Sequence, residues 1–220
     1  VMALVVLVSL VSSTTGAVGD KISSMGTNVL TVMVKDDNGN PLKYEDVLEL
    51  CDEEEIARTA PTGQTSVVAA STYSEETATV TGTSGDYKEI QGLKLYAGRF
   101  LRNVDVKNHT SVVVINAGLA IDVMGRMDVV GETIDLDGKQ FQIIGVLEAD
   151  ENDTNTTENY EAYIPYSSLV RLSDGVSNSI TNFCASASSE DSLDEAEARL
   201  DARMLARFSS DDNYTVINQS

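Results

Sequence analysis

The stretch from residue 129 to residue 147 constrains the fold most strongly, because it predicts a β-hairpin with a defined turn. Residues 133–136 alternate polar and apolar side chains, and residues 139–147 run back with an apolar face of their own. Between them, Asp137 and Gly138 form the Asp-Gly pair that favours a two-residue type I′ turn. One face of the hairpin is therefore expected to be buried.

Two glycines mark special positions in this hairpin. Gly131 precedes the first strand, and Gly145 lies within the second. A glycine inside a strand is typical of a β-bulge or of a place where another backbone approaches closely. We therefore predict a turn at Gly131 and a bulge or a close neighbour at Gly145.

Several further segments share an order of motifs with a known domain family. The hairpin contributes a Val-Gly-Glu-x-Ile run and an Ile-Ile-Gly-Val-Leu ending. The other matches are SMGTNVLTV at 24–32, TGTSGDYKEIQGLKLYAGRF at 81–100, Asp105, SVVVINAGLAIDVMG at 111–125 and YEAYIPYSSL at 160–169. Together these segments resemble the MacB-like periplasmic core domain, which is the extracytoplasmic part of ABC-transporter permease subunits.

The order of the predicted elements indicates an α+β fold whose two ends fold together. Residues 26–85 are predicted as β-α-β-β, residues 86–171 as mostly β with short helices, and residues 172–220 as β-α-β. We therefore expect residues 26–85 and 172–220 to form one lobe, with 86–171 inserted as a second. The resemblance implies the same plan: a discontinuous, ferredoxin-like β-α-β porter lobe near the membrane and a mostly-β outer lobe.

The last predicted helix has clear local signals. Ser192, with Glu195 three residues later, matches the capping-box pattern at a helix N-terminus. Apolar residues then recur at three- and four-residue spacing, at Leu193, Ala196, Leu200, Met204, Leu205 and Phe208. This spacing predicts an amphipathic helix with one buried face.

The first residues, 1–11, form an almost unbroken apolar run. Such a run is shorter than the roughly 20 residues that span a bilayer, and no basic residues precede it as in a signal peptide. It fits a buried core helix or strand, a truncated signal sequence, or the outer end of a membrane-spanning helix. The resemblance favours the third interpretation, so residues 1–25 are expected to end a transmembrane or stalk helix.

Composition excludes several classes of function. With 35 acidic and 15 basic residues, the net charge is −20, which disfavours binding to nucleic acid or to an anionic membrane. A single histidine, His109, makes a zinc site or a histidine-based catalytic site hard to build. Cys51 and Cys184 are too few for a disulfide framework. The predicted elements bring these cysteines close together, and buried free thiols are favoured slightly over a bridge.

Few residues suggest chemistry of their own. Asp36–Asn38 and the acids Asp150, Glu151 and Asp153 supply oxygen ligands of the kind calcium takes, but neither cluster has the EF-hand pattern. The chain has no phosphate-binding Lys motif and no serine nucleophile elbow. His109 is expected in a surface loop. We therefore predict no catalytic, cofactor-binding or metal-binding residues and no enzymatic activity.

The resemblance implies a function in export. It implies a permease at the cell membrane whose domain on the extracytoplasmic side relays ATP-driven motion and contacts substrate or partner. The implied partners are an ABC ATP-binding subunit, which alone hydrolyses ATP, a second permease subunit in a homo- or heterodimer, and in some relatives a membrane-fusion adaptor. Two alternatives stay open. The acidic, loop-rich composition also fits a stand-alone cell-surface module that binds a ligand or acts in adhesion. The other alternative is a hydrolase whose site is assembled from distant carboxylates, although no pair of carboxylates stands out.

Overall fold

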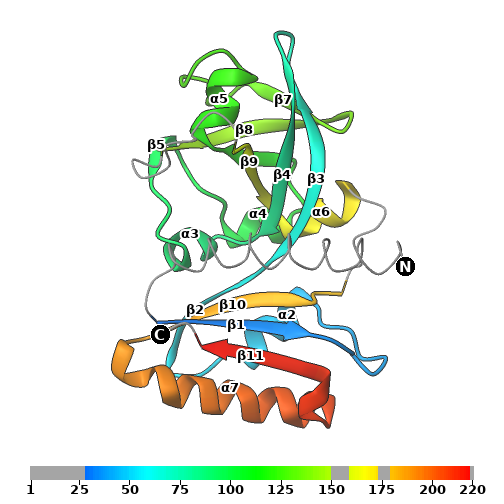
Figure 1. The fold of residues 1–220 in the computed structure, drawn as a ribbon, viewed down its shortest axis with the longest axis vertical. Helices are drawn as coiled ribbons and strands as arrows, with labels where there is room; N and C mark the ends of the chain where they lie inside the picture. Colours follow the sequence, from blue (N-terminus) through cyan, green and yellow to red (C-terminus); the bar gives the residue numbers. More distant parts are fainter. Residues whose placement is uncertain (1–27, 150–158, 173–178, 219–220) are drawn as a thin grey trace, which may run out of the picture.

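A computed structural model describes residues 28–149, 159–172 and 179–218, which form two stacked lobes (Figure 1). The predicted helix end at 1–25 lies outside the described residues, as does the acidic cluster from Asp150 to Asp153. Within the described part of the chain, no helix is long and apolar enough to cross a membrane. The two lobes are each built around one β-sheet.

The first lobe, called here the four-stranded lobe, contains residues 28–61 and 179–218. Its strands are β1 (Val29–Val34), β2 (Ile56–Pro61), β10 (Asn182–Ala187) and β11 (Tyr214–Asn218). They pair antiparallel in the order β11-β1-β10-β2. β1, from the first part of the chain, therefore lies between β10 and β11, which come from the last part. The helices α2 (Tyr44–Leu50) and α7 (Leu193–Phe208) cover one face of this sheet. The short 3-10 helices η1 (Glu190–Ser192) and η2 (Asp211–Asn213) flank α7.

The second lobe, called the seven-stranded lobe, contains residues 62–149 and 159–172. Its strands are β3 (Gly63–Ala70), β4 (Glu75–Thr83), β5 (Leu95–Gly98), β6 (Val112–Ile115), β7 (Thr133–Leu136), β8 (Lys139–Leu147) and β9 (Glu161–Pro165). Their order is β5-β8-β6-β9-β4-β3-β7, and β7 also pairs with β8. The sheet thus closes into a ring, with β5 attached outside it. The short helices are α3 (Tyr87–Ile90), α4 (Asn103–Lys107), α5 (Ala117–Asp122) and α6 (Tyr166–Leu172).

The predicted hairpin is present as β7 and β8. Leu136 faces Lys139, and the two residues between them, Asp137 and Gly138, have φ values of 49° and 80°. Positive φ at both central positions is the type I′ geometry that the Asp-Gly pair favours. The turn also closes the ring, because the backbone N of Asp137 donates to the carbonyl of Val68 at 3.0 Å and its Oδ1 accepts from Val68 N at 2.7 Å.

Both glycine predictions are confirmed. Gly131 has a φ of 95°, which turns the chain into β7. Gly145 lies beyond a register shift in the pairing of β6 with β8, which is the predicted bulge. A Cβ at Gly145 would overlap the carbonyl oxygen of Arg99, where the chain leaves β5. The backbone of that segment can approach β8 only because residue 145 has no side chain.

The predicted division of the chain is wrong for residues 63–83. These residues were expected in the first lobe, but they form β3 and β4 of the seven-stranded lobe. The reason is pairing: β4 lies parallel to β9, and β3 pairs with β7, whereas β2 pairs with β10. The chain therefore crosses between the lobes at Pro61 to Gly63, well before residue 86.

The capping prediction for the last helix is also corrected. Ser192 makes no side-chain hydrogen bond to the helix N-terminus. Instead Ser189 and Ser192 form the capping box, with Ser192 N donating to Ser189 Oγ at 3.2 Å and Ser189 N donating to Ser192 Oγ at 2.9 Å. The cap lies one turn earlier than predicted because η1 precedes α7 and supplies the first turn.

Two apolar clusters pack on opposite faces of the four-stranded sheet. The larger one includes Cys51 and the buried faces of α2 and α7, and it continues into the interior of the seven-stranded lobe. The smaller one lies on the opposite face, where Cys184 and Ala60 meet α3 of the other lobe. Thr59 donates to Cys51 Sγ at 3.2 Å, and the next residue, Ala60, points to the other face beside Cys184. Both cysteines are free and buried, as favoured from the sequence.

Candidate functional site between the two lobes

The two lobes are joined by an apolar contact and a few hydrogen bonds. Tyr87 and Ile90 of α3 pack on the four-stranded sheet in the smaller apolar cluster. Thr83 Oγ1 donates to the carbonyl of Pro61 at 2.7 Å, and Thr62 N donates to the carbonyl of Asn182 at 2.9 Å. This joint fixes one side of the boundary between the lobes.

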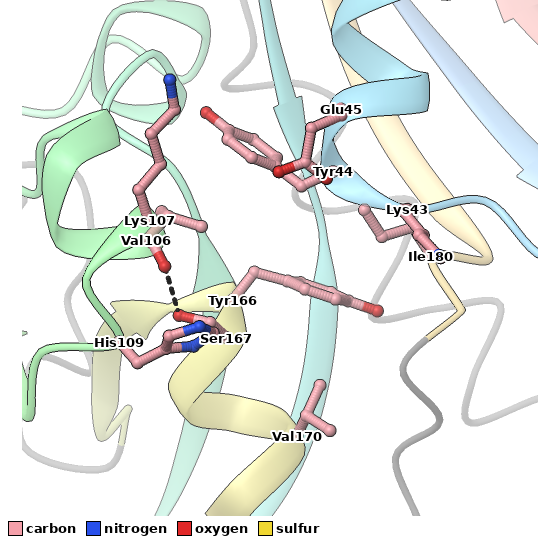
Figure 2. Close-up of a pocket in the computed structure, with 10 residues that line it drawn as sticks. All are labelled: Lys43, Tyr44, Glu45, Val106, Lys107, His109, Tyr166, Ser167, Val170 and Ile180. Atoms are coloured by element: carbon pink, nitrogen blue, oxygen red, sulfur yellow. Dashed lines mark hydrogen bonds between the residues drawn. The ribbon is translucent and has the colours of Figure 1, made fainter.

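A pocket of about 320 Å³ opens at the lobe boundary (Figure 2). It is lined from one side by the start of α2 and by Ile180, which belong to the four-stranded lobe, and from the other side by α4 and α6. Both lobes thus contribute to a single hollow. Any change in the angle between the lobes would change its shape.

The inner wall of the pocket is apolar and aromatic. Val106, Ile180, Tyr44 and Tyr166 line it, and all are buried. Burial raises the pKa of both tyrosines, so both phenols are neutral near pH 7. Tyr166 donates to the carbonyl of Ser179 at 3.3 Å across the boundary, while the buried hydroxyl of Tyr44 has no partner in the described part of the chain.

The rim of the pocket carries positive charge. Lys43 comes from the four-stranded lobe, and Lys107 and His109 come from the seven-stranded lobe. All three are exposed, and none forms an ion pair with another described residue. Glu45 is the acid that lines the same pocket. The arrangement can attract an anionic group in a chain that is otherwise strongly acidic.

The position of the rim depends on α4 and α6. Ser167 Oγ of α6 donates to the carbonyl of Val106 at 2.8 Å, drawn as a dashed line in Figure 2. Arg171 donates to the carbonyl of His109 at 2.6 Å, and His109 has a φ of 53°, in the left-handed region. These bonds fix the segment that carries Lys107 and His109. His109 is at the surface, as predicted.

Asp105, one of the motif residues, holds the start of α4. Its carboxylate accepts from Arg99 at 2.8 and 3.1 Å, and from the backbone N of Arg102 at 2.8 Å. Burial acts to raise the pKa of Asp105, but the hydrogen bonds from Arg99, Arg102 and Thr110 outweigh it and lower the pKa. The ionised carboxylate therefore braces the helix beneath the pocket rim.

The first acidic cluster acts as a turn. Asp36 Oδ1 accepts from Asn38 N and Asp37 Oδ1 accepts from Gly39 N, each at 2.9 Å. Asn38 has a φ of 51°. Across the described residues, histidine, cysteine, aspartate and glutamate form no group of three or more that could hold a metal ion.

Comparison with known proteins identifies the family. The family model for the MacB-like periplasmic core domain matches residues 1–203. The chain belongs to the MacB-like periplasmic core domain family. It is 30% identical over 173 residues to the macrolide export ATP-binding/permease protein MacB of Neisseria gonorrhoeae, covering 74% of this chain and 27% of that protein. The corresponding protein of Acinetobacter baylyi is 24% identical over 229 residues, covering 100% of this chain and 34% of the relative. The chain thus spans about a third or less of these relatives.

Solved structures share the MacB-type fold. The periplasmic region of MacB from Actinobacillus actinomycetemcomitans matches with a TM-score of 0.73 at 23% identity, covering 90% of this chain and 92% of that one. The extracellular domain of the ABC-type transporter YknZ from Gram-positive bacteria matches with a TM-score of 0.69 at 18% identity, covering 87% and 100%. These similarities confirm the predicted mixed α+β fold.

The pocket was not predicted from the sequence. Its rim residues come from two segments that are distant in the chain: Lys43 precedes α2, and Lys107 and His109 lie in a stretch predicted as a loop. None of them stands in a catalytic or metal-binding motif. The only sequence signal was the position of Lys43 and Lys107 in an acidic chain, and that signal does not reveal that they line one pocket.

Proposed function

We propose that this MacB-like domain serves as the extracytoplasmic domain of an ABC-transporter permease subunit. In this proposal it lies outside the cell membrane, relays ATP-driven motion and contacts a substrate or partner during export. It has no catalysis of its own, and a partner subunit or domain hydrolyses ATP. The match of the family model over residues 1–203 supports this proposal most directly. It also favours a transporter over a stand-alone ligand-binding or adhesive module.

The proposed relay rests on a ferredoxin-like porter lobe and a second, outer lobe. The four-stranded lobe contains two β-α-β units, and its strand order β11-β1-β10-β2 is the 4-1-3-2 order of a ferredoxin-like sheet when its strands are numbered along the chain. We assign residues 28–61 and 179–218 to the porter lobe, and residues 62–149 and 159–172 to the outer lobe. The chain crosses from one lobe to the other at Thr62, whose backbone N donates to the carbonyl of Asn182, so motion of one lobe would be passed to the other there.

The proposed assembly contains a second permease subunit, in a homo- or heterodimer, and an ATP-binding subunit or domain. A membrane-fusion adaptor is a third candidate partner. The test is gentle detergent extraction of the tagged full-length gene product from its native membranes, followed by mass spectrometry of co-purifying proteins. We expect a membrane-embedded chain with an ATP-binding subunit or domain. Recovery of a soluble chain without either would contradict the proposal and favour the surface module.

The relay itself can be tested with spin labels on the two lobes. Lys35 follows β1 in the porter lobe, and Lys94 precedes β5 in the outer lobe. Within this domain, cysteines at these positions can be labelled selectively, because Cys51 and Cys184 are buried; cysteines in other parts of the transporter are first replaced by serine. In the purified transporter, we expect the distance distribution between the labels to change when ATP is bound without hydrolysis. An unchanged distribution would rule out motion between the lobes as the relay.

A further inference from the structure

We propose that the pocket between α2, α4 and α6 binds an amphipathic anion, a molecule with an apolar body and a single carboxylate or phosphate group. The proposal goes beyond the transport role, because binding at this pocket needs neither ATP nor a membrane. It rests on the shape of the hollow, on its apolar wall and on the unpaired cations at its rim.

The wall of the pocket suits an apolar body. Val106, Val170 and Ile180 contribute aliphatic groups, and the ring of Tyr166 lies between them (Figure 2). The volume of about 320 Å³ is at the lower end of the range of small-molecule pockets, roughly 300–1,000 Å³. An alkyl chain or a small ring system placed there would exchange water for apolar contact, which favours binding by about 25 cal/mol per Å² buried.

The rim suits an acid group. Lys43, Lys107 and His109 lie around the same opening, and within the described structure none of them has an acidic partner. They come from both lobes, so a bound acid group would be held between the lobes. In a chain of charge −20, two lysines that line one pocket without an acidic partner among the described residues are available to an external anion.

Glu45 sets the limit on ligand charge. Its carboxylate lines the same pocket, so it opposes anion binding and favours a ligand with one acid group over a ligand with several. This opposition gives the proposal a second, independent test. Removing the charge of Glu45 should strengthen binding, whereas removing the lysine charges should weaken it.

The second hollow of the protein serves as an internal comparison. It has a volume of about 340 Å³ and is lined by Arg203 and Arg207 of α7. Both guanidinium groups are already paired, Arg203 with Glu53 and Arg207 with Asp46. An anion there would have to displace a carboxylate. Size alone does not distinguish the two hollows, but the availability of charge does.

The experiment is isothermal titration calorimetry on the 220-residue chain with decanoate and with decyl phosphate, both below their micelle-forming concentrations. Decanol, acetate and decyltrimethylammonium test the apolar body, the acid group and the sign of charge separately. We expect decanoate or decyl phosphate to bind at least tenfold more tightly than all three comparison compounds. Tighter binding of decanoate would assign the site to carboxylates, and tighter binding of decyl phosphate to phosphate esters.

Variants locate the binding at the pocket. K43Q/K107Q should weaken binding of the better probe at least tenfold, and E45Q should strengthen it about fivefold. The matched control K35Q/K94Q removes the same charge elsewhere and should leave affinity unchanged. The proposal is overturned if neither probe binds, if decanol binds as tightly as the anions, or if the control variant weakens binding as much as K43Q/K107Q. Circular dichroism checks that each variant is folded.

Discussion

Asp105 shows how one carboxylate can order a segment that has little regular structure. The segment from Arg99 to Thr110 contains only the short helix α4, yet Asp105 collects hydrogen bonds from both ends of it. The side chain of Asp105 is 7% exposed, whereas that of Arg99 is 36% exposed. The carboxylate thus depends on its donors for stabilisation, and the arginine also has access to water.

Replacing Asp105 by Asn should lower the free energy of unfolding by about 2 kcal/mol at pH 7, because charged hydrogen bonds are lost. Urea denaturation measures this loss, and D128N is the control, because the exposed Asp128 side chain forms no hydrogen bond or ion pair with another described residue. A loss below about 0.5 kcal/mol would mean that Asp105 does not brace α4.

The difference in stability between wild type and D105N should depend on pH. The folded-state pKa of Asp105 is lowered, so the unfolded state takes up the proton first as the pH falls. The stability that Asp105 contributes is therefore complete above the unfolded pKa of about 3.9 and is lost as the pH falls through the lower folded pKa. The difference between wild type and D105N should shrink below about pH 4. A difference that stays constant to pH 2 would contradict this assignment.

Gly145 is expected to tolerate no side chain. A Cβ there would meet the Arg99 carbonyl, which is backbone and cannot move aside cheaply. G145A should therefore lower the free energy of unfolding by about 3 kcal/mol. G138A is the matched control: Gly138 has open space around it, and its φ of 80° should cost about 1 kcal/mol. Equal losses for the two variants would show that close approach is not the cause at residue 145.

At the scale of elements, the turn between β7 and β8 has a second role in the ring. Asp137 bonds Val68 through both its backbone and its side chain, and only Ala69 and Ala70 of β3 pair with β7. The seam between β3 and β7 is therefore short. The stability of this seam therefore depends more on the hydrogen bonds between Asp137 and Val68 than on the two residue pairs between β3 and β7.

D137A should open this seam. The side-chain bond to Val68 N is lost, and alanine is strained at a φ of 49°, so we expect a loss of about 2 kcal/mol. Hydrogen exchange of the Val68 amide should accelerate more than that of Val80, which lies inside β4. D137N, which keeps an acceptor and tolerates positive φ, should restore much of the protection. Uniform acceleration at both amides would mean that the whole lobe is loosened.

Local patterns predicted most elements but not their partners. Residues close together in the sequence specify the hairpin, the amphipathic helix α7 and the bulge at Gly145. The partner of β4 is β9, which lies far along the chain, and no spacing within 63–83 reveals it. The strand β5 was missed because only Leu95 to Gly98 pair, and α4 because its apolar residues are too few to set a period. The pocket forms only where four separate segments meet, at residues 43–45, 106–109, 166–170 and 180.

At the scale of the molecule, charge opposes folding. With a net charge of −20, the acidic side chains repel one another in the folded state. Salt screens this repulsion, because the Debye length falls from about 10 Å at 0.1 M to about 3 Å at 1 M ionic strength. The ion pairs of Arg199 and Arg203 act in the opposite direction, but both arginines are more than a third exposed, so solvent screens the pairs and each contributes little.

The melting temperature should therefore rise between 0.05 and 1 M KCl, by about 2–4 °C for each kcal/mol of repulsion removed. Differential scanning calorimetry at pH 7 measures the rise. Near pH 4, where about half of the carboxylates are protonated, the rise should be much smaller. A melting temperature that falls with salt at pH 7 would mean that the ion pairs outweigh the repulsion.

The strand order of the four-stranded sheet also determines when that sheet can form during synthesis. β1 pairs only with β10 and β11, and β2 only with β10, so the first two strands have no partner until residue 182 has left the ribosome. By then the whole ring of the other lobe has emerged and can close. The nascent chain thus holds two unpaired strands while residues 62–181 are synthesised, and the inserted lobe can be complete before the four-stranded sheet begins to form.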